Sequence, residues 1–137
     1  EESKEQEKKL LTGFDIIVAE DEPYNYELVE RILRKSGAKL LWAQNGQEAV
    51  DLVRKSTGER KCIVLMDIKM PVMDGLDANK QIKKIKSEIP VIALTAYAQA
   101  SDRSRIMQSD FDDYMSKPIN PKKLIEMLTF YATKISK

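Results

Sequence analysis

Short apolar runs alternate five times with amphipathic stretches along this chain of 137 residues, once the first 13 residues are passed. The runs are rich in Ile, Val and Leu and have the length of buried β-strands. The longest one, Cys62-Ile63-Val64-Leu65-Met66, ends directly before an aspartate. We therefore expect strands at residues 14–19, 39–43, 62–66, 91–95 and 113–115.

The stretches between these runs repeat their apolar residues every three to four positions, which is typical of helices with one buried face. Gly37 follows the first stretch as a candidate C-cap, Asn45 precedes the second as an N-cap, and Pro121 begins the fifth. In the third stretch, most lysines lie outside the apolar face, so we expect their side chains to be in solvent. The fourth, residues 99–108, has a thin apolar stripe and is a candidate moving part.

Strict alternation of strand and helix predicts an α/β fold, in which helices cover both faces of a parallel sheet. Right-handed crossovers limit the topology, and five units suit a doubly wound (βα)5, flavodoxin-like sheet with strand order 2-1-3-4-5. Ligands of such sheets bind at the carboxyl ends of the strands, between the first and third strands.

Polar residues of complementary chemistry stand at these strand ends. Glu20 and Asp21 follow the first strand, and Asp67, Thr95 and Lys117 lie at the ends of the third, fourth and fifth. Two carboxylates about 5 Å apart repel by about 3 kcal/mol at an effective dielectric constant of about 20, so such a group needs a cation. The set indicates phosphoryl chemistry on a carboxylate with a hard metal ion present.

Composition removes several other kinds of site. The chain has no histidine, which excludes Ser-His-Asp catalysis and zinc sites that contain histidine. The remaining oxygen ligands favour Mg²⁺, Mn²⁺ or Ca²⁺. A net charge of +1 is too small to attract nucleic acid or a membrane surface through the charge of the whole domain. The apolar runs are too short to span a bilayer. A single cysteine indicates a reducing compartment, and we expect a cytoplasmic domain whose parent protein can be membrane-anchored.

Four short motifs follow one another on the predicted strand ends: Ala19-Glu20-Asp21-Glu22, the segment from Leu65 to Gly75 (LMDIKMPVMDG), Leu94-Thr95-Ala96, and Tyr114-Met115-Ser116-Lys117-Pro118. Together they closely resemble the receiver domain of two-component response regulators. The resemblance runs from about Phe14 to Phe130 and is strongest to receiver domains of hybrid sensor histidine kinases.

The resemblance implies that Asp67 accepts a phosphoryl group from a phosphohistidine of a partner. It implies Mg²⁺ as cofactor, with a metal site formed by Glu20, Asp21, Asp67 and the backbone carbonyl of Lys69. Lys117 would neutralise the phosphoryl oxygens and Thr95 would bond one of them, so catalysis rests on positioning and charge. The domain would thereby catalyse its own phosphorylation and dephosphorylation.

The resemblance also implies a switch. Thr95 moves toward the phosphoryl group, Tyr114 swings inward behind it, and the surface of the fourth helix, fifth strand and fifth helix changes. Lys117-Pro118 resembles the family's cis peptide. Lys69 and Tyr97 stand where the family tunes phosphoryl lifetime, and we expect bulky Tyr97 to restrict the attacking water. Asp110 stands where many relatives carry glycine, which matters only if the turn needs a positive φ.

The expected phosphodonor is a histidine kinase domain or a histidine phosphotransfer protein, which docks around the first helix from Tyr24 onward. We expect no direct contact with nucleic acid or membrane, and a homodimer remains open. Residues 1–13 form a charged lead-in or linker, and residues 14–137 the receiver domain. Because the chain starts at Glu1 rather than Met, it suits a receiver from a hybrid kinase better than a stand-alone one.

Two other functions compete with this interpretation. A phosphatase of the haloacid-dehalogenase type also phosphorylates an aspartate with Mg²⁺, but it needs an acid two residues later, where this chain has Lys69. A pseudo-receiver that never takes phosphate would be favoured by loss of a pocket residue, and none is lost.

Overall fold

The computed structural model describes residues 10–96 and 100–135, so Tyr97 and most of the charged lead-in lie outside the described residues. The described chain forms one parallel sheet with strand order β2-β1-β3-β4-β5, which confirms the predicted topology. Its strands are β1 (Phe14–Ala19), β2 (Lys39–Ala43), β3 (Lys61–Asp67), β4 (Val91–Thr95) and β5 (Asp113–Ser116). Its helices are α2 (Pro23–Leu33), α3 (Gly46–Lys55), α4 (Gly75–Ile85), α5 (Ala100–Gln108) and α6 (Pro121–Ile135).

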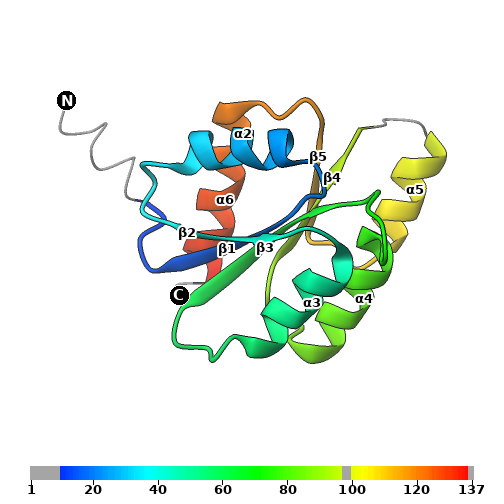
Figure 1. Cartoon of the computed structure of the whole chain (residues 1–137), viewed down its shortest axis with the longest axis horizontal. Helices are drawn as coiled ribbons and strands as arrows, with labels where there is room; N and C mark the ends of the chain where they lie inside the picture. Colours follow the sequence, from blue (N-terminus) through cyan, green and yellow to red (C-terminus); the bar gives the residue numbers. More distant parts are fainter. Residues whose placement is uncertain (1–9, 97–99, 136–137) are drawn as a thin grey trace.

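Helices cover both faces of the sheet. In Figure 1, α2 and α6 lie on one face and α3 and α4 on the other. Successive strand residues point to opposite faces, so β3 sends Ile63 and Leu65 toward α2 and α6, and Val64 and Met66 toward α3 and α4. Because both faces are buried, the strand sequence reads as an unbroken apolar run.

The described side chains of helix α5 are mostly exposed. Among its described side chains, residues 103–108, only Ile106 is buried. This agrees with the thin apolar stripe expected from the sequence. A helix that buries so little surface can shift at small cost in free energy.

Two sequence expectations need correction. Helix α2 ends at Leu33 with Arg34 as its C-cap, because the Ser36 amide and hydroxyl both donate to the Leu33 carbonyl. Gly37 lies beyond this end, in the following turn, with φ of 88°. Lys83 is not on a solvated face: its side chain is 12% exposed, and its ammonium donates to Asp112 and to a backbone carbonyl.

Two further details concern the ends and turns of the fold. Leu11 is buried, and its amide donates to the Ser36 carbonyl at 2.9 Å, so packing includes residues before Phe14. Among the described non-glycine residues, Val72 alone has a positive φ, so the turn at Asp110 has no need of glycine. In the described part of the chain, no helix is long and apolar enough to cross a membrane.

Candidate functional site

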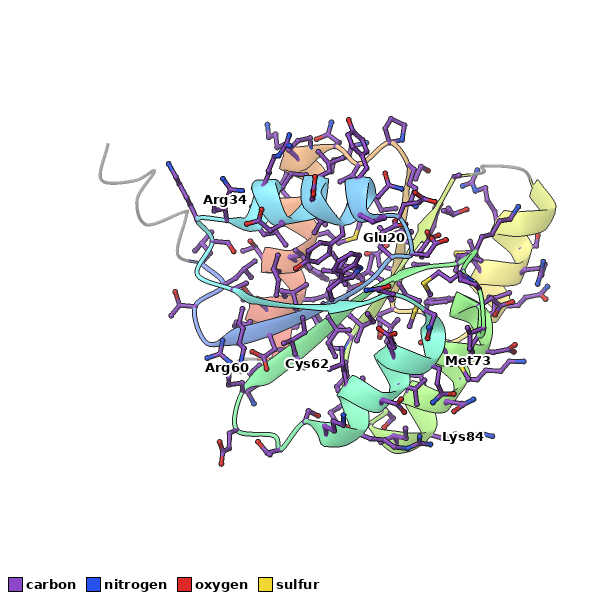
Figure 2. All side chains as sticks on the ribbon, in the orientation of Figure 1. Glu20, Arg34, Arg60, Cys62, Met73 and Lys84 are labelled. Carbon is purple, nitrogen blue, oxygen red and sulfur yellow. The ribbon has the colours of Figure 1, made fainter. Side chains whose placement is uncertain are left out.

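A cleft of about 600 Å³ lies at the carboxyl ends of β1, β3, β4 and β5. The strand register explains this position. Ala19 of β1 pairs with Met66 of β3, so the residues that follow them, Glu20 and Asp67, lie side by side. Figure 2 shows Glu20 at this edge of the sheet, with Cys62 and Arg60 near the opposite edge. The residues that line the cleft include Asp21, Asp67, Lys69, Thr95, Arg105 and Lys117.

Three carboxylates meet in the cleft. Glu20, Asp21 and Asp67 each offer an oxygen, and these oxygens all lie within 4.8 Å of one another. Glu20 and Asp67 are 2% and 7% exposed, so water screens their mutual repulsion poorly. Clustered carboxylate oxygens are the donor set that hard divalent cations prefer. The residues present therefore fit the Mg²⁺ site expected from the sequence.

Lys117 forms ion pairs with two of these carboxylates. Its ammonium donates to Glu20 Oε1 at 2.9 Å and to Asp67 Oδ2 at 3.0 Å. Burial alone would lower the pKa of Lys117, but its hydrogen bonds and attraction to the two carboxylates outweigh burial and raise that pKa. The Lys117 amide donates to the Thr95 carbonyl at 2.7 Å, and the Lys117-Pro118 peptide is cis, as expected.

The loop after Asp67 folds back over the strand end. The Lys69 amide donates to Asp67 Oδ1 at 3.3 Å, and the Gly75 amide donates to the Ile68 carbonyl at 2.9 Å. A Cβ atom at Gly75 would collide with the carbonyl oxygen of Asp67, so this close return of the chain requires glycine. The Asp74 carboxylate caps α4 by accepting from the Asp77 amide at 3.0 Å.

The expected switch residues occupy two different places. Thr95 is buried and lines the cleft. Tyr114 lies outside it on β5, where its hydroxyl accepts a hydrogen bond of 3.0 Å from Arg103 of α5. The Arg103 guanidinium is also 5.9 Å from the centre of the Tyr114 ring. These contacts join α5 to β5 beside the cleft.

The structure adds residues that the sequence patterns did not reveal. Arg105 of α5 lines the cleft as a third basic residue, beside Lys69 and Lys117. The Trp42 indole N–H donates to the Glu20 carbonyl at 2.8 Å from the end of β2. No periodicity marks Arg105 as special, because most of α5 is polar. For Trp42 the available signal was its position one residue before the end of the strand beside β1.

Comparisons with known proteins agree with this geometry. A family model described as the response regulator receiver domain matches residues 16–129. Hybrid signal transduction histidine kinase I of Dictyostelium discoideum is 39% identical over 120 residues, or 82% of this chain, and the match covers only 7% of that relative's length.

Two solved structures are similar along most of their length. The receiver domain of a Pseudomonas aeruginosa sensor histidine kinase, with a magnesium ion coordinated in its active-site cleft, is 31% identical with a TM-score of 0.77. That match covers 85% of this chain and 95% of the other. The receiver domain of Ssk1 of Saccharomyces cerevisiae, crystallised with the histidine phosphotransfer protein Ypd1, is 27% identical with a TM-score of 0.78 and covers 88% and 90% of the two chains. With its fold, its acidic cleft and the family match over most of its length, this chain belongs to the receiver domain family of two-component response regulators.

Proposed function

We propose that this receiver domain takes a phosphoryl group onto Asp67 from a phosphohistidine of a partner protein. The observation that carries the proposal is the contact of one ammonium group, that of Lys117, with both Glu20 and Asp67. A salt bridge that merely stabilised the fold would not need three carboxylates in one cleft. An acceptor for a phosphoryl group needs this combination of nucleophilic oxygen and positive charge.

In the transfer step, a carboxylate oxygen of Asp67 attacks the phosphorus atom and forms a new P–O bond. The P–N bond of the phosphohistidine breaks, and its electron pair leaves with the imidazole, which takes a proton from solvent. The product is an acyl phosphate on Asp67. The Lys117 ammonium lies 3.0 Å from Asp67 Oδ2, so it can stabilise the negative charge of the phosphoryl group during transfer. The Thr95 hydroxyl, in the same cleft, can donate to a phosphoryl oxygen.

A bound Mg²⁺ would supply the charge neutralisation that one lysine cannot complete for three carboxylates and a phosphoryl group. Glu20, Asp21 and Asp67 would hold the ion through their carboxylates, and Lys69 would hold it through its backbone carbonyl. The clustered oxygens of the three acids support this assignment.

The proposed output is a change of the surface formed by α5, β5 and α6. Phosphorylation draws the Thr95 hydroxyl toward the phosphoryl group, and Tyr114 then moves inward behind it. Arg103 contacts both the hydroxyl and the ring of Tyr114, so this movement must break or reshape the contact. The small buried surface of α5 keeps the cost of that change low.

The proposed partner is a histidine kinase domain or a histidine phosphotransfer protein. A donor is necessary because this chain contains no histidine. The similar receiver domain of Ssk1 forms a complex with the phosphotransfer protein Ypd1. Tyr24, at the start of α2 close to the acidic residues, is 75% exposed and offers a docking contact.

The test is phosphorylation by acetyl phosphate with Mg²⁺, followed by intact mass measurement. The wild-type domain should gain one phosphoryl group and Asp67→Asn should gain none. Asp74→Asn is the matched control, because it removes a carboxylate from the same cleft while asparagine can still cap α4. Equal labelling of wild type and Asp67→Asn would refute the proposal, and an unlabelled wild type would favour the pseudo-receiver.

A further inference from the structure

All four polar atoms of Glu20 have hydrogen-bond partners. Its amide donates to the Ala43 carbonyl at 2.9 Å, and its carbonyl accepts from the Trp42 indole N–H at 2.8 Å. Its carboxylate accepts from the Lys117 ammonium at 2.9 Å and from the Glu22 amide at 3.2 Å. Both the backbone and the carboxylate of this residue are therefore held in one orientation.

The bond from Trp42 acts on the peptide unit that joins Glu20 to Asp21. A peptide unit is planar, so a hydrogen bond that fixes the direction of its carbonyl also fixes the plane. The two acids that flank this plane are two of the three carboxylates clustered in the cleft. Losing the indole N–H would leave the carbonyl free to rotate toward water, and both carboxylates would lose part of their alignment.

The indole ring is itself held between two elements. Trp42 belongs to β2 and pairs with Val18 of β1. Its ring stacks on that of Tyr26 in α2, with ring centres 4.5 Å apart and planes 9° apart. Helix α2 begins at Pro23, directly after the acidic residues. The stack thus ties the helix, the edge strand and the acidic peptide into one unit.

We propose that Trp42 is a positioning residue for the cation-binding acids, and that its stack with Tyr26 couples α2 to them. The proposal rests on the cation site proposed above and concerns its affinity for Mg²⁺ rather than the stability of the fold. Trp42 is the only tryptophan of the chain, so its fluorescence reports on the same contact.

The test is an amide NMR titration with MgCl₂, which measures the Mg²⁺ dissociation constant without any phosphorylation. Trp42→Phe keeps an aromatic face for Tyr26 and removes the N–H donor. Because one neutral hydrogen bond is involved, we expect its dissociation constant to rise about threefold to tenfold. Tyr26→Leu keeps the N–H donor and removes the stack, and it should weaken binding in the same direction by a smaller factor.

Tyr131→Phe is the matched control. It also removes an aromatic donor to a backbone carbonyl, that of Asp112 at 2.9 Å, but at the opposite edge of the sheet. Its stability should fall while its Mg²⁺ dissociation constant stays at the wild-type value. An unchanged constant in Trp42→Phe, or an equal loss in Tyr131→Phe, would overturn the positioning role.

Wild-type tryptophan emission gives a measurement that depends on no variant. It should change with Mg²⁺ and saturate at the dissociation constant found by NMR. Emission that stays flat while the amide shifts saturate would overturn the coupling and leave the cation site intact. Amide shifts in the wild type that never saturate would reject the cation site and this inference together.

Discussion

The Lys117 ammonium lies 3.0 Å from the Asp67 carboxylate, although the two residues are 50 positions apart. Parallel strands bring them together, because β3 and β5 both end at the same edge of the sheet. The same ammonium bonds Glu20, so one cation compensates two buried acids. Losing it would remove the ion pairs of both carboxylates with Lys117.

Replacement of Lys117 by methionine should therefore weaken the Mg²⁺-free domain. We expect the free energy of unfolding to fall by about 1–3 kcal/mol, because the carboxylates then repel without compensation. Mg²⁺ should restore most of the loss by binding the same oxygens. Urea unfolding with and without MgCl₂ measures both effects, and an equal loss in the two conditions would contradict this account.

Substitution of Thr95 by alanine should separate phosphorylation from switching. Asp67 and Lys117 remain in place, so mass measurement should still find one phosphoryl group on the variant. The amide NMR changes that phosphorylation causes in α5, β5 and α6 should largely disappear. Thr95→Ser keeps the hydroxyl and should retain those changes; a Thr95→Ala spectrum that shifts as in the wild type would argue against a switch through this hydroxyl.

Replacement of Tyr97 by alanine should shorten the lifetime of the acyl phosphate severalfold. Tyr97 lies outside the described residues, so this expectation rests on the sequence alone. A smaller side chain two residues after Thr95 would admit the attacking water more easily. The measurement is phosphate release from the purified phosphorylated domain, compared with Phe130→Ala, which removes an exposed aromatic side chain that does not line the cleft. An unchanged half-life would show that Tyr97 does not restrict the attacking water.

The pH dependence of stability should have a component from Tyr131. Burial, followed by its hydrogen bond to the Asp113 carboxylate, raises the pKa of Tyr131 from 10.0 to about 12. Because the folded-state pKa is the higher one, this stabilisation is complete below pH 10 and is lost as the pH rises to about 12. Tyrosinate absorbance should show this late titration in the wild type and lack it in Tyr131→Phe. If Tyr131→Phe shows the same tyrosinate titration as the wild type, the late titration belongs to another tyrosine.

The sheet and most of the acidic site could be predicted because they depend on local pattern and on topology. Once β1 and β3 are adjacent, Glu20 and Asp67 must meet. The sequence does not show which long side chains turn back onto backbone groups. Lys83 looks like a solvated lysine, yet it bonds Asp112, which is 29 residues away.

Other details depend on exact geometry at element ends. Gly37 resembles a helix cap in the sequence, but the hydrogen bonds of Ser36 to the Leu33 carbonyl lie at the end of α2, before Gly37. The bond from Trp42 to the Glu20 carbonyl depends on strand register and on the Tyr26 stack, and no single-residue pattern encodes either. Arg105 reaches the cleft through the placement of α5, the helix with the weakest apolar signal.

The most direct test of the central claim is chemical location of the phosphoryl group. The domain is phosphorylated with Mg²⁺ present, treated with borohydride, which reduces an acyl phosphate to an alcohol, and then digested for peptide mass analysis. We expect homoserine at position 67 and unmodified residues at Glu20, Asp21 and Asp74. Reduction at any of those three acids, or a phosphorylated domain with Asp67 unmodified, would contradict the account.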